Sequence, residues 1–238
     1  MSDDASAVAS AGTHAIVVAD GDVPDRASID RSWPGWDADA TLVIAADGGL
    51  LRAERLGLRP TLVVGDLDSL PPEDVERAVA AGVPVQRSRP DKDESDGELA
   101  VLAAIASGAQ RITLLGAFGG RLDHALANLG LLAHPALVGR DACFLDAAAR
   151  VTLVTAPDAA GEPVDRALPG PPGATISLLP FGGDVSGVTT RGLRYPLRDE
   201  LLTVGPARGL SNVREAPDAA VRVRSGRLLV VENAPGRF

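Results

Sequence analysis

The sequence predicts an α/β protein, in which a parallel-sheet α/β domain (residues 13–150) is followed by an all-β sandwich domain (residues 151–238). In the first part, short apolar runs rich in β-branched residues alternate with helix-length segments, a pattern typical of parallel strands joined by right-handed crossovers. In the second part, short apolar runs are separated by Gly and Pro turns, and no segment has a helix-length pattern. This second pattern is typical of a small sandwich or half-barrel.

The first part is expected to contain strands near residues 14–19, 41–46, 61–64, 83–88, 111–115 and 141–145. Helices are expected between them, near residues 50–56, 71–81, 96–107 and 123–134. The segment from Trp33 to Trp36 marks a loop or a helix break, and residues 156–173, rich in Pro, Gly and Ala, are expected to form a linker or long loop. Later strands are expected near residues 174–179, 185–189, 201–204, 221–224 and 228–231, with Ser225-Gly226 as a hairpin turn.

Composition narrows the possible partners of the chain. The 238 residues carry a net charge of −9, which argues against nucleic acid or an anionic membrane surface, because both need a basic face. The longest apolar run, residues 99–106, is far below the ~20 residues of a membrane span. Cys143 is the one cysteine, so no disulfide can form within the chain, and residues 1–12 lack the basic start of a signal peptide. We therefore expect a cytoplasmic protein with a frayed N-terminal tail.

Two acidic stretches stand out as a candidate site. Asp66 and Asp68 follow the apolar run 61–64, as at the carboxyl edge of a parallel sheet, where open α/β proteins bind ligands. On an extended chain these two carboxylates would point the same way, about 7 Å apart, and would repel by about 2 kcal/mol. The second stretch, residues 91–98, contains the S-x-x-E spacing of a capping box and predicts a helix that begins near Asp96.

A cation would relieve the repulsion within such a cluster, particularly if Asp93 and Asp96 joined it. All-oxygen ligands suit Mg²⁺, which is commonly shared with the phosphates of a substrate. The alternative is that each of these acids is only a loop polar or a helix-start residue. Taken one at a time, the acids leave both interpretations open, and their combination at a strand end and a helix start favours a metal site.

Three further features favour phosphate chemistry. Lys92 is the one lysine of the chain and lies between two aspartates. Its compact ammonium group is suited to contact a phosphate, which Arg would not do in the same way. The alternative is that this lysine has no function and remains by chance in a chain whose other basic residues are Arg. Asp47-Gly48-Gly49 joins a strand to a helix start, where free N–H groups could meet an anion. The segment around Arg121, Asp123, His124 and Asn128 opens another helix, and its alternative interpretation is a helix cap with solvated polar side chains. The chain has no P-loop, no G-x-S-x-G motif and no Cys/His metal spacing.

Five motifs in order resemble the thiamine pyrophosphokinase family: Ala46–Gly49, Gly65–Ser69, Asp91–Glu98, Gly119–Asn128 and Gly209–Asn212. The resemblance spans about residues 14–233. It implies an α/β domain, a β-sandwich and a homodimer with active sites between the subunits. It also implies Mg²⁺-dependent transfer of diphosphate from ATP to the hydroxyl of thiamine, with thiamine diphosphate and AMP as products.

The resemblance also assigns residues to roles. It implies that metal and phosphates are held by Asp47, Asp66, Asp68 and Asp96. It places Asp93, Lys92 and Arg121 around ATP, with Gly48 at the helix start. It implies that thiamine meets Ser211 and Asn212, with contributions from Asp123 and Asn128. The sequence departs from the family at Ser95 and at Val213, and it has no Trp in the C-terminal part. The residue that would stack on the thiamine ring is therefore not specified.

Three other functions are compatible with parts of this pattern. A related enzyme could transfer diphosphate to a pterin alcohol, although the Gly209–Asn212 segment weighs against it. A Mg²⁺-dependent phosphohydrolase could also use Asp-x-Asp at a strand end, with water as nucleophile and no need of the β-domain. A non-catalytic sensor of thiamine or nucleotide is the third alternative.

Overall fold

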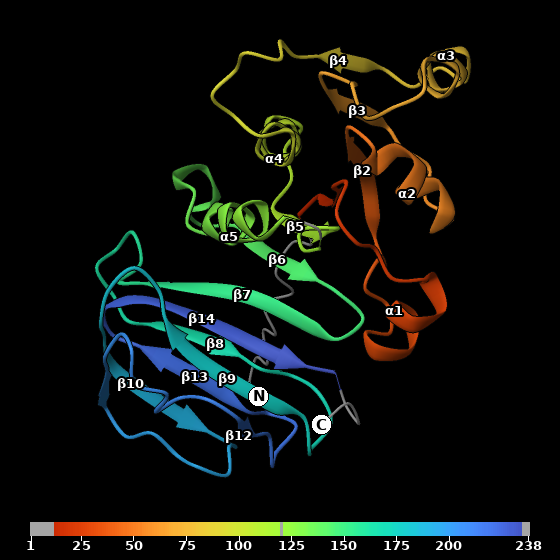
Figure 1. The fold of residues 1–238 in the computed structure, drawn as a ribbon. Helices are drawn as coiled ribbons and strands as arrows, with labels where there is room; N and C mark the ends of the chain where they lie inside the picture. Colours follow the sequence, from red (N-terminus) through yellow and green to blue (C-terminus); the bar gives the residue numbers. More distant parts are fainter. Residues whose placement is uncertain (1–11, 120, 235–238) are drawn as a thin grey trace, which may run out of the picture.

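The computed structural model describes residues 12–119 and 121–234, and confirms the predicted α/β architecture followed by a β-sandwich (Figure 1). The expected N-terminal tail lies almost wholly outside the described residues. Over the described ranges, the strands form one sheet of ten and one sheet of four. The larger sheet has the order β12-β9-β14-β7-β6-β5-β1-β2-β3-β4.

The N-terminal half contains the parallel part of this sheet. Its strands are β1 (His14–Val18), β2 (Ala40–Ala46), β3 (Leu62–Gly65), β4 (Val85–Arg87), β5 (Arg111–Leu115) and β6 (Asp141–Leu145). Its helices are α1 (Arg26–Ser32), α2 (Gly49–Arg55), α3 (Pro72–Ala80), α4 (Asp96–Ala106) and α5 (Leu122–Leu131), with a 3₁₀ turn η1 (Pro135–Leu137). All six predicted strands and four predicted helices are present, with shifted ends.

Apolar residues alternate between the two faces of the parallel strands, and helices cover both faces. Ala15 and Val17 of β1 pack with α4, whereas Ile16 and Val18 pack with α1 and α2. Figure 1 shows α4 and α5 on one side of the sheet and α1, α2 and α3 on the other. This double cover explains why these strands read as continuous apolar runs.

The C-terminal half is a sandwich of two antiparallel sheets. Its strands are β7 (Ala149–Ala156), β8 (Val164–Ala167), β9 (Thr175–Pro180), β10 (Val185–Arg191), β11 (Glu200–Leu202), β12 (Asn212–Val213), β13 (Ala220–Val223) and β14 (Gly226–Asn233). The smaller sheet has the order β11-β10-β13-β8. Its buried valines and leucines pack against β7, β9 and β14 to form a second aliphatic core.

Two features of the β-half correct the sequence analysis. The expected linker 156–173 contains β8, an edge strand too short and polar to be predicted from periodicity. The turn at Ser225-Gly226 does not close a hairpin, because β13 pairs with β8 and β10 while β14 pairs with β7 and β9. The chain therefore crosses from one sheet to the other at this turn.

The sheet is continuous between the two halves. β6 is the last parallel strand, and β7 pairs with it in antiparallel fashion through Cys143↔Thr152 and Leu145↔Arg150. The boundary expected at residue 150 therefore falls inside β7. The division of the chain into two domains, residues 13–150 and 151–238, remains a prediction. None of the helices in the described part of the chain is long and apolar enough to span a bilayer.

Candidate active site

Three aspartates converge where β2 and β3 end. Asp47 follows β2, and Asp66 and Asp68 follow β3. Each of the three offers a carboxylate oxygen within 4.8 Å of the oxygens of the other two. Because the strands are parallel neighbours, their carboxyl ends bring together residues that are about twenty positions apart in the chain. The sequence prediction that these acids share one edge is therefore correct.

Asp47 is the most enclosed member of the cluster. Its backbone N–H donates to the Val64 carbonyl at 2.9 Å, which holds it against β3, and the residue is only 5% exposed. Burial raises the pKa of its carboxyl group, the Ser69 hydroxyl opposes this increase, and the charges of Asp96, Asp68 and Asp66 add to it. Its Oδ1 is buried and has no hydrogen-bond partner among the described residues.

The chain between Asp66 and Asp68 is not extended, which corrects the geometry expected from the sequence. Leu67 has a φ of +66° and is buried, so the backbone turns there. The N–H of Asp68 donates to Oδ1 of Asp66 at 3.2 Å, which closes this turn. Burial of Leu67 in the apolar cluster below the edge holds the unusual backbone, and the turn brings the two carboxylates closer than an extended strand would.

Gly65 is required at the centre of the cluster. Its φ is +145°, a region that residues with a Cβ rarely adopt. A Cβ built on Gly65 would also lie 3.1 Å from Oδ1 of Asp96 and 3.2 Å from Cβ of Asp47. The missing side chain therefore lets β2, β3 and α4 place their carboxylates around one point.

Asp96 reaches the cluster from the start of α4. Ser95 caps this helix, since its Oγ accepts a hydrogen bond from the Glu98 N–H at 3.1 Å. This confirms the predicted helix start. Nζ of Lys92 lies 2.9 Å from Oδ1 of Asp96 and 3.8 Å from Oδ2 of Asp66. Lys92 thus connects the two acidic stretches that the sequence analysis singled out.

The three carboxylates of Asp47, Asp66 and Asp68 are close enough to hold one divalent cation, and Asp96 lies beside them. The donor set consists of oxygen atoms only, and one buried oxygen of Asp47 lacks a partner within the described ranges. Hard cations such as Mg²⁺ prefer such ligands. Lys92 compensates only part of the negative charge, so a cation would remove a repulsion that the fold otherwise retains.

Asp20 is a neighbour of this edge that the sequence analysis did not single out. A Cβ on Gly48 would lie 2.3 Å from Oδ1 of Asp20, and one on Gly49 would lie 1.9 Å from the Val18 carbonyl. Oδ1 of Asp20 in turn accepts a hydrogen bond from Nε of Arg52 at 3.1 Å. The glycines at 48 and 49 therefore permit close packing of α2 on β1, with the Asp20 carboxylate against Gly48.

The segment before α5 lies along the same edge. Phe118 packs edge-to-face on the buried Phe144, with ring centroids 5.4 Å apart. Arg121 and Asp123 form an ion pair with each other and are both exposed, and this pairing lowers the pKa of Asp123 to about 2. Asn128 donates to the Ala117 carbonyl at 2.7 Å, and its Oδ1 is 3.5 Å from a Cβ built on Gly97.

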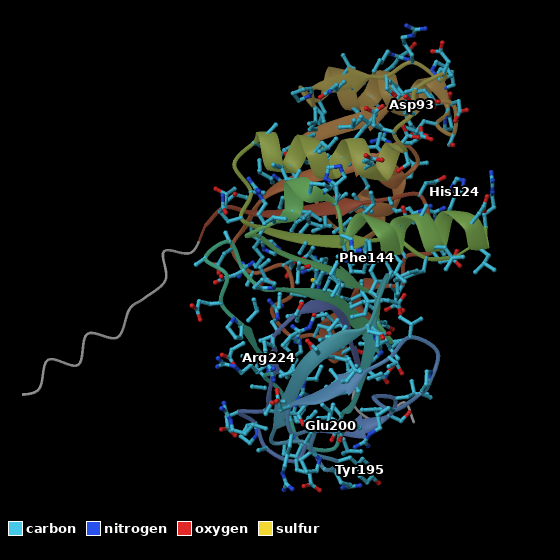
Figure 2. The ribbon with its side chains drawn as sticks, turned by 90° about the vertical axis from the view of Figure 1, so that its left-hand side faces the viewer. Asp93, His124, Phe144, Tyr195, Glu200 and Arg224 are labelled. Atoms are coloured by element: carbon cyan, nitrogen blue, oxygen red, sulfur yellow. The ribbon has the colours of Figure 1, made fainter. Side chains whose placement is uncertain are left out.

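These contacts separate the residues that the resemblance assigned to ATP and thiamine into two groups. Asn128 packs against the first turn of α4, next to Asp96. Asp93 and Arg121 are exposed, and the structure gives neither a contact with the aspartate cluster. Figure 2 shows Asp93 and His124, the latter in the first turn of α5, on the same side of the molecule.

Ser211 and Asn212 are not brought to this surface within one chain. They lie at β12, at the opposite end of the ten-stranded sheet, which is on the order of 35 Å from β3 at normal strand spacing. Ser211 is exposed with a φ of +57°. Asn212 is buried, and its amide both donates to the Tyr195 carbonyl and accepts from the Tyr195 N–H.

Comparison with known protein families agrees with this architecture. Residues 36–143 match the family "Thiamin pyrophosphokinase, catalytic domain". Residues 165–230 match the family "Thiamin pyrophosphokinase, vitamin B1 binding domain". The two matches follow the order of the α/β half and the sandwich, and together they cover most of the chain.

Individual relatives extend over nearly the same length. The chain is 28% identical over 216 residues to thiamine pyrophosphokinase 1 of Oryza sativa subsp. japonica, covering 82% of this chain and 79% of the relative. It is 26% identical over 178 residues to thiamine pyrophosphokinase of Bacillus subtilis, covering 75% and 80%. The crystal structure of thiamin pyrophosphokinase from Geobacillus thermodenitrificans has a TM-score of 0.76 and 26% identity, covering 94% of this chain and 99% of that one. From the paired domain matches and this shared fold we conclude that the chain belongs to the thiamine pyrophosphokinase family of enzymes.

Proposed function

We propose that this chain transfers diphosphate from ATP to the hydroxyl of thiamine in a Mg²⁺-dependent reaction at the aspartate cluster. The observation that carries the proposal is the convergence of Asp47, Asp66 and Asp68 within 4.8 Å, beside the Lys92–Asp96 pair. Family membership supplies the substrates. Mg²⁺ bound by these carboxylates would neutralise charge on the phosphate chain of ATP and fix its orientation.

The side chains of the site would act mainly by position and charge. Asp47, Asp66, Asp68 and Asp96 would hold the cation, and Lys92 would provide a second positive charge for the phosphates. The thiamine oxygen forms a bond to the β-phosphorus while the bond from that phosphorus to the oxygen bridging the α-phosphate breaks, so AMP leaves and the hydroxyl proton is released. Phosphoryl transfer of this type needs little covalent help from the protein.

We further propose that the working enzyme is a homodimer with shared sites, located in the cytoplasm. The distance between β12 and β3 supports a shared site, because Ser211 of one chain cannot approach the aspartates of the same chain. Exposed apolar side chains supply surfaces for a partner: Leu122 and Leu126, one turn apart on α5, and Tyr195 and Leu210 in the β-half. α5 buries none of its described residues in the monomer.

One assay distinguishes the candidate reactions. Purified protein is incubated with ATP, Mg²⁺ and thiamine, and the nucleotide products are separated by chromatography. AMP formation that depends on thiamine, with loss of activity in EDTA, is the expected result. Free phosphate without an alcohol acceptor would indicate a phosphohydrolase, and AMP formation only with a hydroxymethyl pterin would indicate the related diphosphokinase.

Mixing two inactive variants tests the shared site. Asp68→Asn removes a carboxylate, and Ser211→Trp obstructs the surface beside β12, where Ser211 is exposed. If each site uses both chains, mixed dimers contain one site free of both substitutions and recover up to about a quarter of the native activity. No recovery in mixtures shown to exchange subunits would place the whole site in one chain.

A further inference from the structure

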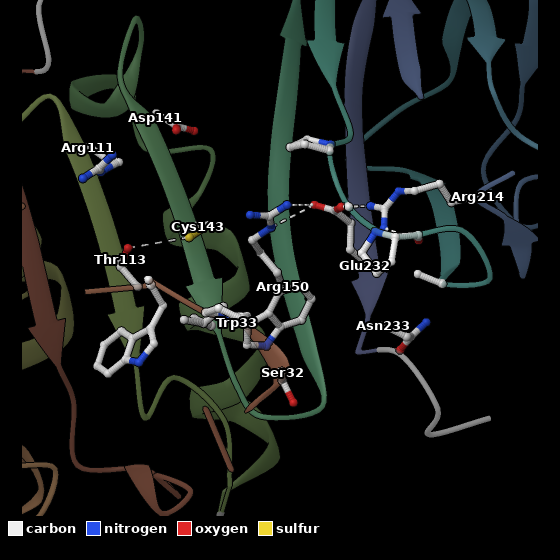
Figure 3. Close-up of a pocket in the computed structure, with 18 of the residues that line it drawn as sticks. Ser32, Trp33, Arg111, Thr113, Asp141, Cys143, Arg150, Arg214, Glu232 and Asn233 are labelled. Atoms are coloured by element: carbon white, nitrogen blue, oxygen red, sulfur yellow. Dashed lines mark hydrogen bonds and ion pairs between the residues drawn. The ribbon is translucent and has the colours of Figure 1, made fainter. Parts of the chain in front are cut away.

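A cavity lies at the opposite edge of the parallel strands from the aspartate cluster. It has a volume of about 600 Å³ and is bordered by His14, Arg111 and Asp141, the first residues of β1, β5 and β6. The loop after α1 closes one side with Trp33, and the segment 169–171 closes another (Figure 3). The cavity is therefore lined by both halves of the chain and does not touch the proposed catalytic edge.

The cavity is strongly positive in a chain that is negative as a whole. Five arginines line it, namely Arg31, Arg111, Arg150, Arg166 and Arg214, against the two carboxylates of Asp141 and Glu232. The lining therefore has an excess of three positive charges, or two when Asp39 beside Arg111 is counted, whereas the whole chain has a net charge of −9. Such a local excess in a concave site favours an anion.

The ion pairs of the cavity leave specific arginines available. Glu232 is shared by Arg150 and Arg214, and Asp141 accepts from Arg166 at 2.7 Å. Arg31 is exposed, and its one hydrogen bond within the described part of the chain goes to the Ser28 hydroxyl at 3.3 Å. Arg111 lies 4.0 Å from Asp39 and donates to the Ala38 carbonyl through Nη2, whereas its buried Nε has no hydrogen-bond partner in that same part of the chain.

The other titratable groups of the cavity do not cancel this charge. Burial raises the pKa of the Cys143 thiol to about 11, so it stays neutral. Burial also lowers the pKa of His14, which is held by Thr113 and the Ala38 carbonyl, so it remains an uncharged imidazole at pH 7. The guanidinium of Arg150 lies 5.3 Å from the centroid of the Trp33 ring, which presents a flat apolar wall beside the charges.

We propose that this cavity is a second binding site, for a small organic anion that carries at least two phosphate or carboxylate groups. Arginine forks bind both groups in bidentate fashion, and the volume lies within the range of metabolite pockets. Thiamine itself is a cation and is repelled by the lining. An occupant would connect the α1 loop to the β-half and would stabilise their present arrangement.

Calorimetric titration of the full chain tests the site. The experiment uses protein freed of divalent cations on a chelating resin, in a chelator-free buffer of low ionic strength, with pyrophosphate and citrate as probes, because the aspartate cluster without a cation repels both. One anion per chain is expected. Arg31→Gln, which removes the uncompensated charge, should weaken binding about tenfold, and Arg31→Gln/Arg166→Gln should weaken it further.

The matched control is Arg55→Gln. Arg55 is exposed on α2, outside the cavity, and its substitution changes the net charge equally. Binding of pyrophosphate alone would identify phosphate esters as the ligand class, and binding of both probes would extend it to polycarboxylates. The proposal is wrong if neither anion binds, if Arg31→Gln and Arg55→Gln bind alike, or if Arg31→Gln only changes the oligomeric state.

Discussion

Nζ of Lys92 lies 2.9 Å from Oδ1 of Asp96 and 3.8 Å from Oδ2 of Asp66, so one ammonium group connects the loop before α4 to the end of β3. Burial alone would lower the pKa of Lys92, but the contact with Asp96 and the charges of Asp66 and Asp47 outweigh it and raise the pKa. Lys92 is therefore a permanent cation at neutral pH, placed among carboxylates that would otherwise repel one another.

Substitution of Lys92 should affect catalysis more than folding. Lys92→Met removes a charge-assisted contact and should lower kcat/KM for ATP about ten- to a hundredfold. Lys92→Arg should not restore activity. The Lys92 side chain is only 13% exposed, and the larger planar guanidinium group does not fit where the compact ammonium group lies. The control is Arg89→Gln, an exposed cation on the same loop, and steady-state kinetics is the measurement. Full activity of Lys92→Arg would show that only net charge matters.

Asp68→Asn should abolish most activity without destabilising the fold. The substitution removes one proposed metal ligand and reduces repulsion within the cluster, so kcat should fall at least about a hundredfold while Tm is unchanged or higher. Asp218→Asn, an exposed acid in the β-half, changes the charge equally and should leave both quantities unchanged. Normal turnover by Asp68→Asn would remove this residue from the site.

Gly65→Ala should disrupt the site through geometry. The positive φ costs about 1–2 kcal/mol for a residue with a Cβ, and the added methyl group would press on Asp96 and Asp47. Gly82→Ala is the matched control, since Gly82 also has a positive φ, of +82°, but a Cβ there meets no atom within 4 Å. Both variants should have a lower free energy of unfolding in urea. Under conditions in which both are folded, only Gly65→Ala should have reduced Mg²⁺-dependent activity. Equal activities would show that the cluster tolerates the methyl group.

Ser211 and Asn212 should respond differently to truncation. Asn212→Ala removes both hydrogen bonds between the buried Asn212 amide and the backbone of Tyr195 and should destabilise the chain by about 1–3 kcal/mol. Ser211→Ala removes an exposed hydroxyl and should leave Tm unchanged while raising the KM for thiamine. Thermal unfolding and kinetics for each variant separate the two roles, and an unchanged KM in Ser211→Ala would exclude that hydroxyl from the thiamine site.

His14 should make stability depend on pH. Burial lowers the pKa of His14 in the folded chain below its ordinary value of 6.5, so the unfolded chain binds an additional proton in acid. The contribution of the neutral imidazole to the free energy of unfolding is fully present above pH 6.5. This contribution declines as the pH falls from 6.5 toward the lowered pKa. Tm measured between pH 8 and pH 5 should therefore fall less in His14→Gln than in the native chain. Parallel curves for the two proteins would contradict this assignment.

The local sequence determined the elements and much of the catalytic edge. Apolar runs bounded by Gly and Asp predicted the parallel strands, because strands buried on both faces carry a continuous apolar signal. The spacing from Ser95 to Glu98 predicted the start of α4, because an N-cap is a contact between near neighbours in the chain. The rule that parallel strands end at a common edge predicted the position of Asp66 and Asp68, and the family resemblance added Asp47 to them.

Tertiary structure alone decided the rest. The left-handed turn at Leu67 depends on burial of that side chain, and the pairing of β6 with β7 depends on contacts that no local pattern specifies. Distance across the sheet separates Ser211 from the aspartates, although both lie in family motifs. The positive cavity draws arginines from positions 31 to 214, and each of them alone resembles an ordinary surface residue. Sequence records the propensity of each segment, whereas a site built from distant segments exists only once their packing brings the charges together.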